Sequence, residues 1–180
     1  MNGYMNSGIR VNYPRTKYIK ANQFIREKIE KIISNYLYIT SISTDDKFVY
    51  NLDISYEDYS YNNIESFVFF ISTATGGAHP NNTIFTVNYD SSLDKIITIE
   101  DLIKKNGNIL NILSRNSYMI LSKNKNIVDQ NMLIDGLKPV ISNFSNIVFT
   151  PRGLKIYFPQ YQVAPYSAGS FQVLINYQNI

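Results

Sequence analysis

The side chains that most often carry out catalysis or bind metals are scarce in this chain, which has one histidine, His79, and no cysteine among 180 residues. Without cysteine there is no thiolate nucleophile, no disulfide framework and no zinc site built on thiolates. A single histidine also excludes any site that needs two imidazoles. No G-x-S-x-G segment presents a serine of the kind that many Ser-His-Asp hydrolases use. The sequence predicts that the chain is not an enzyme, and a hydrolase built on His79 with a nearby serine or aspartate stays the weaker alternative.

His79 lies in a segment that is typical of a turn. Gly76-Gly77 is followed by Ala78-His79-Pro80, whereas a phosphate-binding loop continues with a lysine and a helix. Glycine readily adopts the positive φ angles that tight turns between strands require. We therefore expect His79 to cap or pack against a turn.

Carboxylates come together at three places, Asp45-Asp46, the group Asp53, Glu57 and Asp58, and Glu100-Asp101. The surrounding sequence indicates a loop for the first, the polar face of a strand for the second and the first turn of a helix for the third. A calcium ion needs about 6–8 oxygen ligands. We expect no metal and no cofactor, with an oxygen-ligated calcium site as the alternative.

The overall charge and hydropathy of the chain restrict its partners. The net charge of +3 gives only weak attraction to anions, and basic residues do not alternate with aromatic ones, so no nucleic acid is expected. No apolar run approaches the roughly 18 residues of a membrane helix. Met1–Asn6 lacks the basic and apolar parts of a secretion signal. We expect a soluble chain whose targeting segment is absent or removed.

The first half of the chain changes from helical to strand periodicity. Ile9–Val11 is a short apolar start, and apolar residues then recur every three or four positions between 17 and 37, which predicts an amphipathic helix. Residues 48–57 alternate between apolar and polar, as in a half-exposed antiparallel strand. Phe67–Ile71 suits a central strand and Thr83–Tyr89 alternates again. These three strands predict a meander.

The second half predicts helices followed by strands. Thr98 precedes acidic residues, as a helix cap does, and helical patterns continue to residue 120 and over 132–141. Asn146–Thr150 and Leu154–Phe158 flank a Pro-Arg-Gly turn, and Phe171–Ile175 alternates. Because helices and strands occur in separate runs, we predict an α+β fold. An antiparallel β-sheet packs against the N-terminal amphipathic helix and a second helical segment, in a single domain over residues 1–180.

The segment Tyr157–Gly169 holds three tyrosines and two prolines. Tyrosine combines a large apolar area with a polar tip and is common in contact surfaces, and proline lowers the cost of ordering a loop that presents it. Alternatively, these tyrosines close one end of the core. The residues alone leave both interpretations open.

Several motifs between residues 76 and 169 follow one another in a characteristic order. They are Gly76-Gly77-Ala78-His79, Tyr89-Asp90, Ile99–Ile103, Phe149–Phe158 and Tyr161–Gly169. In this order they resemble the extracytoplasmic domain of RsiV-type anti-sigma factors, which is also found in PdaC-type polysaccharide deacetylases. The resemblance is specific for residues 66–180 and less so for 1–65.

The resemblance implies a bacterial α+β domain outside the cytoplasmic membrane, normally held there by a tether that this chain does not show. In RsiV-type members the domain is a receptor for lysozyme. Lysozyme is therefore the first expected partner, and peptidoglycan glycan is the alternative, as for an accessory domain of a deacetylase. The binding residues that the resemblance implies are Pro159, Tyr161, Tyr166, Ser72, Thr75 and His79, with Tyr161 as the anchor.

Overall fold

The computed structural model describes residues 7–42 and 48–180. The chain divides into two compact units. Unit 1 comprises residues up to Glu57 together with Phe69–Thr83, and unit 2 comprises Asp58–Val68 and Ile84–Ile180. Each unit is described by itself below, and the single domain stays a prediction. The predicted α+β fold is confirmed.

The first sheet has five strands in the order β1-β2-β3-β4-β5. Their bounds are β1 (Ser7–Val11), β2 (Tyr50–Tyr61), β3 (Ile64–Ala74), β4 (Asn81–Asp90) and β5 (Lys95–Ile97). A two-residue turn joins β2 to β3, and its first residue, Asn62, has a φ of 53°, a conformation that asparagine tolerates. The predicted meander of three strands is therefore confirmed, with strands longer than expected.

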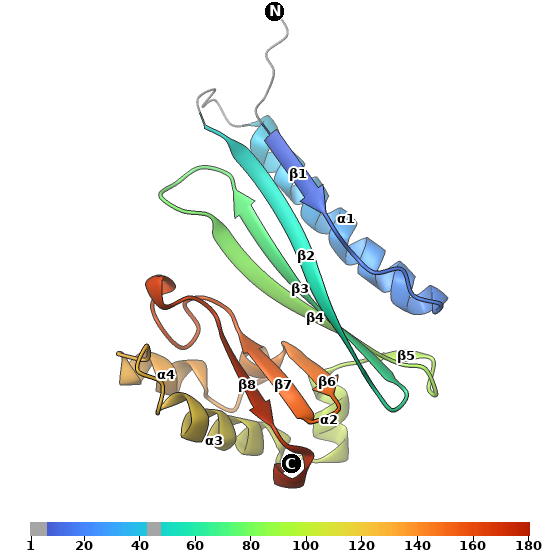
Figure 1. Ribbon diagram of the computed structural model, residues 1–180, viewed down its shortest axis with the longest axis vertical. Helices are drawn as coiled ribbons and strands as arrows, with labels where there is room; N and C mark the ends of the chain where they lie inside the picture. The colour runs from blue at the N-terminus through green and yellow to red at the C-terminus, as the bar shows by residue number, and fades with distance from the viewer. Residues whose placement is uncertain (1–6, 43–47) are drawn as a thin grey trace, which may run out of the picture. The chain divides into compact units, whose positions relative to one another are not determined.

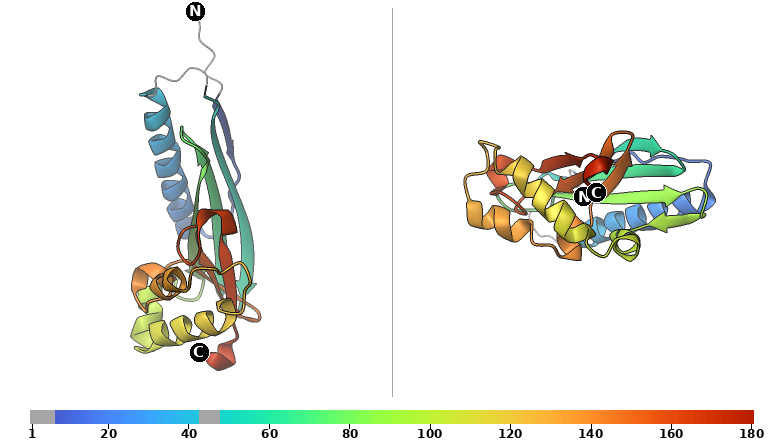
Figure 2. Two further views of the ribbon diagram at one scale, coloured as in Figure 1. Left: turned by 90° about the vertical axis from the view of Figure 1, so that its left-hand side faces the viewer. Right: turned by 90° about the horizontal axis from the view of Figure 1, so that it is seen from below.

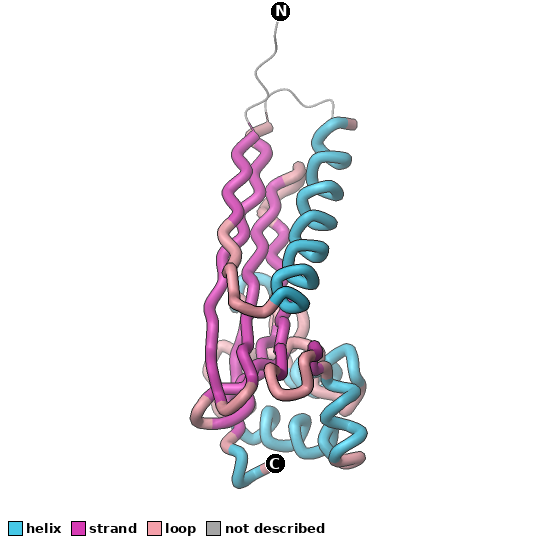
Figure 3. The backbone as a smooth tube through the Cα atoms, turned by 90° about the vertical axis from the view of Figure 1, so that its right-hand side faces the viewer, coloured by secondary structure: helices cyan, strands magenta, loops and turns pink. Residues whose placement is uncertain are grey.

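One pairing in this sheet differs from the antiparallel expectation. β1 pairs in parallel with β2, so that Ile9 lies opposite Leu52 and Val11 opposite Ile54. Parallel neighbours need a long crossover connection, usually a helix, and α1 (Ile19–Ser41) provides it. In unit 1, α1 runs alongside these strands (Figures 1 and 3) and buries Ile25, Ile29 and Tyr36.

Unit 2 contains a second sheet and three short helices. The helices are α2 (Ile99–Lys105), α3 (Ile109–Leu121) and α4 (Gln130–Gly136), and the antiparallel sheet has the order β6-β7-β8. The strands are β6 (Ile147–Thr150), β7 (Gly153–Phe158) and β8 (Phe171–Ile175), and the 3-10 turns are η1 (Ile141–Phe144), η2 (Tyr166–Ala168) and η3 (Tyr177–Asn179). The helix expected over 132–141 is thus α4 followed by η1.

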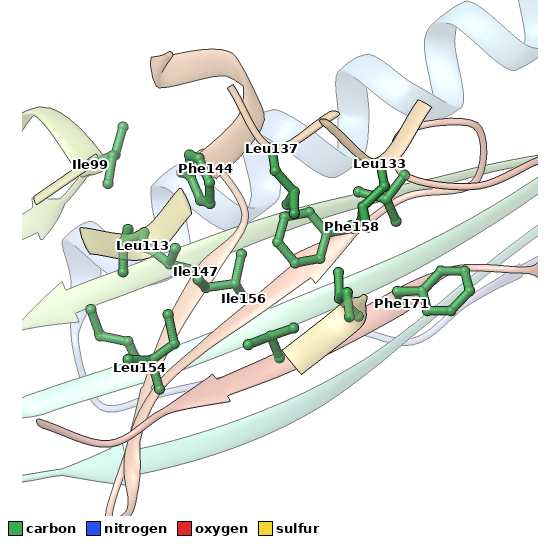
Figure 4. Packing of buried hydrophobic residues seen from close by; sticks show 14 of the residues in the cluster. Ile99, Leu113, Leu133, Leu137, Phe144, Ile147, Leu154, Ile156, Phe158 and Phe171 are labelled. Atoms are coloured by element: carbon green, nitrogen blue, oxygen red, sulfur yellow. The ribbon is translucent and has the colours of Figure 1, made fainter. Parts of the chain in front are cut away.

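The core of unit 2 lies between this sheet and the helices. Leu154, Ile156 and Phe158 alternate along β7 and are at most 1% exposed. They pack with Leu113 of α3 and Phe144 of η1 in one apolar cluster (Figure 4). Figure 2 shows α3 against one side of the three strands. Alternation along a strand leaves Lys155 and Tyr157 on the other face of the sheet.

Backbone N–H and C=O groups on the outer edge of β6 form hydrogen bonds with side chains of unit 2. The Phe149 N–H donates to Ser66 Oγ at 3.0 Å, and Asn88 Nδ2 donates to the Ile147 carbonyl at 2.9 Å. Both Ser66 and Asn88 are buried. Unpaired backbone groups on an edge strand would otherwise offer a template for another chain.

Asp101 stabilises the start of α2, and its contribution to the free energy of unfolding should depend on pH. The Asp101 carboxylate accepts hydrogen bonds from Lys95 Nζ at 2.7 Å and from the Thr98 N–H at 3.0 Å. These contacts, the one with Lys95 first, hold the pKa of Asp101 below its usual value. A carboxyl with a lowered pKa stabilises the fold above the pKa it has when unfolded, and this stability is lost as pH falls through the folded-state pKa.

We therefore expect Asp101→Asn to lower the free energy of unfolding by about 1 kcal/mol near neutral pH, the usual value of a helix cap. The difference from the wild type should shrink toward zero as the pH falls through the pKa of Asp101. Urea unfolding across this pH range measures it. Glu30→Gln, an exposed change on α1, serves as the control, and a difference between Asp101→Asn and wild type that persists at acid pH would contradict the assignment.

Candidate functional site

A tight turn follows β7 and presents Tyr161. The Gln162 N–H donates to the Pro159 carbonyl at 3.1 Å. Tyr161, the third residue of this turn, has a φ of 67°, whereas Gln160 has a negative φ. This is the pattern of a type II turn, whose third position normally requires glycine or asparagine.

Tyr161 is both strained and exposed. An L-residue in the left-handed region costs roughly 1–2 kcal/mol relative to its usual conformations. The residue is nevertheless 58% exposed, and its ring lies 5.5 Å from that of Tyr166, between centroids, at an angle of 41°. Strain that is kept at an exposed aromatic residue is typical of functional loops. The two tyrosines form a small aromatic surface.

The last residue of the turn and the two residues after it hold the turn against the rest of unit 2. Gln162 Nε2 donates to the Gly136 carbonyl at 3.0 Å, at the end of α4, and to the Asn143 carbonyl at 2.9 Å, in η1. Val163 and Ala164 are buried in the core of unit 2. The Tyr161 ring is therefore carried on a rigid base, which lowers the entropy lost when a ligand binds.

A shallow hollow of about 550 Å³ opens beside Tyr161. Its lining includes the carboxylates of Asp129 and Asp135 and the amides of Asn131 and Asn143. Asp129 Oδ1 accepts a hydrogen bond from the Met132 N–H at 3.0 Å, and Asp135 pairs with Lys138 Nζ at 2.7 Å. An aromatic ring beside several carboxylate and amide groups can pack on the apolar face of a sugar and hydrogen-bond its hydroxyls. Asp129 also offers a negative charge to a cationic protein surface, whereas the charge of Asp135 is balanced by Lys138.

Comparison with known proteins relates this unit to a family. A family model described as "Protein of unknown function (DUF3298)" matches residues 100–178, which span α2 to β8 and include the Tyr161 turn. Residues 100–178 are therefore similar to the DUF3298 family.

A similarity to one known protein extends over most of the chain. The chain is 30% identical over 170 residues to the "Peptidoglycan-N-acetylmuramic acid deacetylase PdaC" of Bacillus subtilis strain 168. The match covers 92% of this chain and 36% of the relative, so the chain spans little more than a third of that protein. The predicted PdaC-like resemblance is confirmed.

Two solved structures share the fold. A DUF3298 family protein from Pseudomonas aeruginosa PAO1 has a TM-score of 0.57 at 16% identity, over 72% of this chain and 60% of its own. A member of the same family from Bacteroides fragilis NCTC 9343 has a TM-score of 0.53 at 17% identity, over 85% of this chain and 60% of its own. At such identities the likeness concerns the fold alone.

The structure places the six predicted binding residues in two groups. Pro159 and Tyr161 belong to the turn in unit 2, and Tyr166 of η2 lies against Tyr161, all within the residues that match the DUF3298 model. The other three belong to unit 1: Ser72 near the end of β3, Thr75 directly after it, and His79 in the following loop. The role of all six in binding stays a prediction.

The loop after β3 has the turn conformation that its glycines predict. Gly76 and Gly77 have φ angles of 110° and 98°. His79 is exposed, and its Nδ1 lies 3.0 Å from the Pro80 carbonyl oxygen. The predicted connection between two strands is confirmed, as a loop from residue 75 to 80, and the packing of His79 against it stays a prediction.

The hollow beside Tyr161 was not predicted from the sequence. Its groups come from α4, η1 and the turn, three segments spread over residues 129–162, and no local motif joins them. Gly136 was the one available signal, because a glycine at the end of a helix often marks a close approach of another segment.

Over residues 7–42 and 48–180, no group of three or more His, Asp or Glu side chains could hold a metal ion. Asp45-Asp46, one of the predicted acidic clusters, lies outside the described residues. In the same part of the chain, no helix has the length and apolar character needed to cross a membrane.

Proposed function

We propose that this chain is a non-catalytic binding domain that acts outside the cytoplasmic membrane of a bacterium and holds cell-wall glycan at the Tyr161 turn. The observation that carries the proposal is the exposed Tyr161 ring, kept at a positive φ beside a hollow of carboxylates and amides. Such a surface suits a neutral, hydroxyl-rich ligand.

The relationship to PdaC supports a ligand in the cell wall. The name of that relative states that it deacetylates N-acetylmuramic acid in peptidoglycan. An enzyme that works along an insoluble polymer benefits from a second domain that holds the polymer, because linking two binding modules raises the effective concentration. We assign this accessory role, and no deacetylation, to the present chain. A place outside the cytoplasmic membrane follows from the same argument.

The proposal predicts that Tyr161→Gly strongly weakens binding without unfolding the domain. Glycine is at ease at the φ of this position, so the free energy of unfolding should stay unchanged or rise by about 1 kcal/mol. Binding to purified peptidoglycan sacculi, measured by co-sedimentation, should fall at least about tenfold, the usual effect of losing an aromatic anchor. Tyr118→Ala removes an exposed tyrosine from α3 and serves as the control. Wild-type protein that stays entirely in the supernatant would refute glycan binding.

A second candidate ligand is lysozyme, as the resemblance to RsiV-type domains implies. The observation that favours it is the negative charge of Asp129 next to Tyr161, since the charge of Asp135 is balanced by Lys138. Lysozymes of animals are cationic, and complementary charge speeds encounter and selects partners. The net charge of +3 opposes this attraction, so only this local charge supports it.

Calorimetric titration with lysozyme at moderate salt separates the two candidates. Saturable heat that disappears in Tyr161→Gly would place lysozyme at the turn and favour a lysozyme-sensing domain. If no heat develops while sacculi still bind, the glycan remains as the ligand of this surface.

A further inference from the structure

A groove on the other face of the second sheet has a different character from the Tyr161 surface. It has a volume of about 650 Å³ and lies within unit 2 at the turn between β6 and β7. Its lining includes Arg152, Lys155, Gln172, Leu174 and Tyr59. The groove lies near the first residues of β7, and the Tyr161 turn follows its last residue. The two sites therefore lie at opposite ends of this strand.

Lys155 is held at the centre of this groove by aromatic residues. Its Nζ donates to the Tyr59 hydroxyl at 2.9 Å and lies 5.2 Å and 4.9 Å from the ring centroids of Tyr59 and Tyr157. The two hydroxyls of these tyrosines are in turn 3.1 Å apart. Cation–π contacts and a neutral hydrogen bond fix the position of the ammonium group, but they do not neutralise its charge.

The positive charge in the groove has no carboxylate to balance it. Arg152 and Lys155 both line the groove, and its lining includes neither aspartate nor glutamate. Within residues 7–42 and 48–180, no ion pair joins Arg152 or Lys155 to a carboxylate. Lys155 is half-buried, and a partly desolvated cation normally has an anionic partner. Two cations at one groove, on a fixed aromatic base, offer a site to an anion.

The rest of the lining indicates what carries the anion. Leu174 lies opposite Lys155 and Gln172 opposite Tyr157 in the β7–β8 register, so an apolar side chain and an amide flank the ammonium on the same face. Pro151 adds a second apolar wall. The apolar side chains suit the C–H faces of a sugar or polyol, and the Gln172 amide and the Tyr59 hydroxyl suit its hydroxyl groups.

We propose that this groove is a second ligand site, which binds an oxyanion carried on a sugar or polyol, with Lys155 as the central contact and Arg152 at its rim. The oxyanion is a phosphate or a carboxylate. The site does not depend on the function proposed for Tyr161, because it uses other residues and another ligand charge.

The test is a titration of the full chain followed by NMR. The probes are glycerol 3-phosphate, which carries a phosphate, N-acetylmuramic acid, which carries a carboxylate, and N-acetylglucosamine, which is neutral. We expect saturable shifts of the Arg152, Lys155 and Gln172 amides with at least one anionic probe, and binding of the neutral sugar weaker by about tenfold or more. The tighter of the two anions identifies the source of the oxyanion.

Lys155→Met keeps the length and apolar part of the side chain and removes its charge. It should weaken binding of the anionic probe by about tenfold or more, as expected for a lost charge-assisted hydrogen bond. Lys123→Met, the same change at an exposed lysine after α3, should leave binding within about twofold. Arg152→Gln at the exposed turn should weaken binding by about threefold and provides the test if Lys155→Met does not fold. Tyr161→Gly should leave this binding unchanged.

The proposal is overturned if neither anion shifts the amides of the groove, or if the neutral sugar binds as tightly as both anions. It is also overturned if Lys123→Met weakens binding as much as Lys155→Met, since binding would then reflect the net charge alone. Equal binding by wild type and by the folded Lys155 or Arg152 variants would overturn it as well.

Discussion

Gly136→Ala is expected to lower the free energy of unfolding by several kcal/mol and to displace the Tyr161 turn. A Cβ at this position would lie 1.9 Å from the carbonyl oxygen of Gln162 and 2.7 Å from its carbonyl carbon. Both atoms belong to backbone, which cannot move aside as the end of a side chain can. Forcing even one methylene into a packed region costs about 1–3 kcal/mol, and a clash with backbone more.

The same clash should also weaken binding. The clash requires α4 and the turn to separate if an alanine is to fit. This separation would break the hydrogen bond that Gln162 Nε2 donates to the Gly136 carbonyl. The Tyr161 ring then loses its fixed base, and binding at that surface should fall together with stability. Urea unfolding and co-sedimentation with sacculi measure the two effects.

Gly107→Ala provides a matched control for this change. A Cβ at Gly107 would meet no atom within 4 Å, and alanine lowers the entropy of the unfolded chain. We expect this variant to unfold at the same or a slightly higher urea concentration than the wild type and to bind normally. Equal stability of Gly136→Ala and Gly107→Ala would show that α4 and the turn are not in close contact.

The parts of the fold that the sequence predicted are those set by local patterns. The alternation from residue 48 to 57 and the apolar spacing before it specify β2 and α1 almost alone. The sequence Pro151-Arg152-Gly153 predicted the turn of the β6–β7 hairpin. In the structure Gly153 adopts a φ of 154°, which other residues avoid. Periodicity and turn residues of this kind predict an element from its own sequence, without knowledge of the segment that packs against it.

The parallel pairing of β1 with β2 could not be predicted in the same way. Ile9–Val11 is too short to show a period, and its pairing depends on α1 returning the chain to its side. The edge of β6 gives a similar case. Ser66 and Asn88 resemble ordinary polar positions on a strand, and only the fold shows that they satisfy Phe149 and Ile147.

The candidate site was predicted in its anchor and missed in its surroundings. The Pro- and Tyr-rich segment drew attention to Tyr161 but left its exposure open, and the structure shows that the residue is exposed. Its positive φ was not readable, because tyrosine disfavours that region and the turn imposes it. The Lys155 groove was missed because its lysine, its tyrosines and Arg152 are brought together from β2 and the β6–β7 hairpin.

Phe158→Ala is the second change with a large expected effect, because Phe158 joins the core to the Tyr161 turn. Its ring is fully buried and meets Phe144 edge-on, at 6.1 Å between centroids and 82° between planes. Truncating a buried phenylalanine costs about 3–5 kcal/mol from lost burial and the cavity that remains. Urea unfolding of unit 2 should show this loss, whereas Val140→Ala, at an exposed position before η1, should change little.

Phe158 also immediately precedes Pro159, so the cavity would form directly beneath the Tyr161 turn. We expect the folded fraction of Phe158→Ala to bind sacculi more weakly than the wild type, although Phe158 touches no ligand, because the base of the turn would no longer be fixed. Phe158→Leu fills most of the space and should recover part of both stability and binding. A variant that loses stability but binds with full affinity once folded would show that the turn is positioned by Gln162 and Gly136 alone, independently of the core behind it.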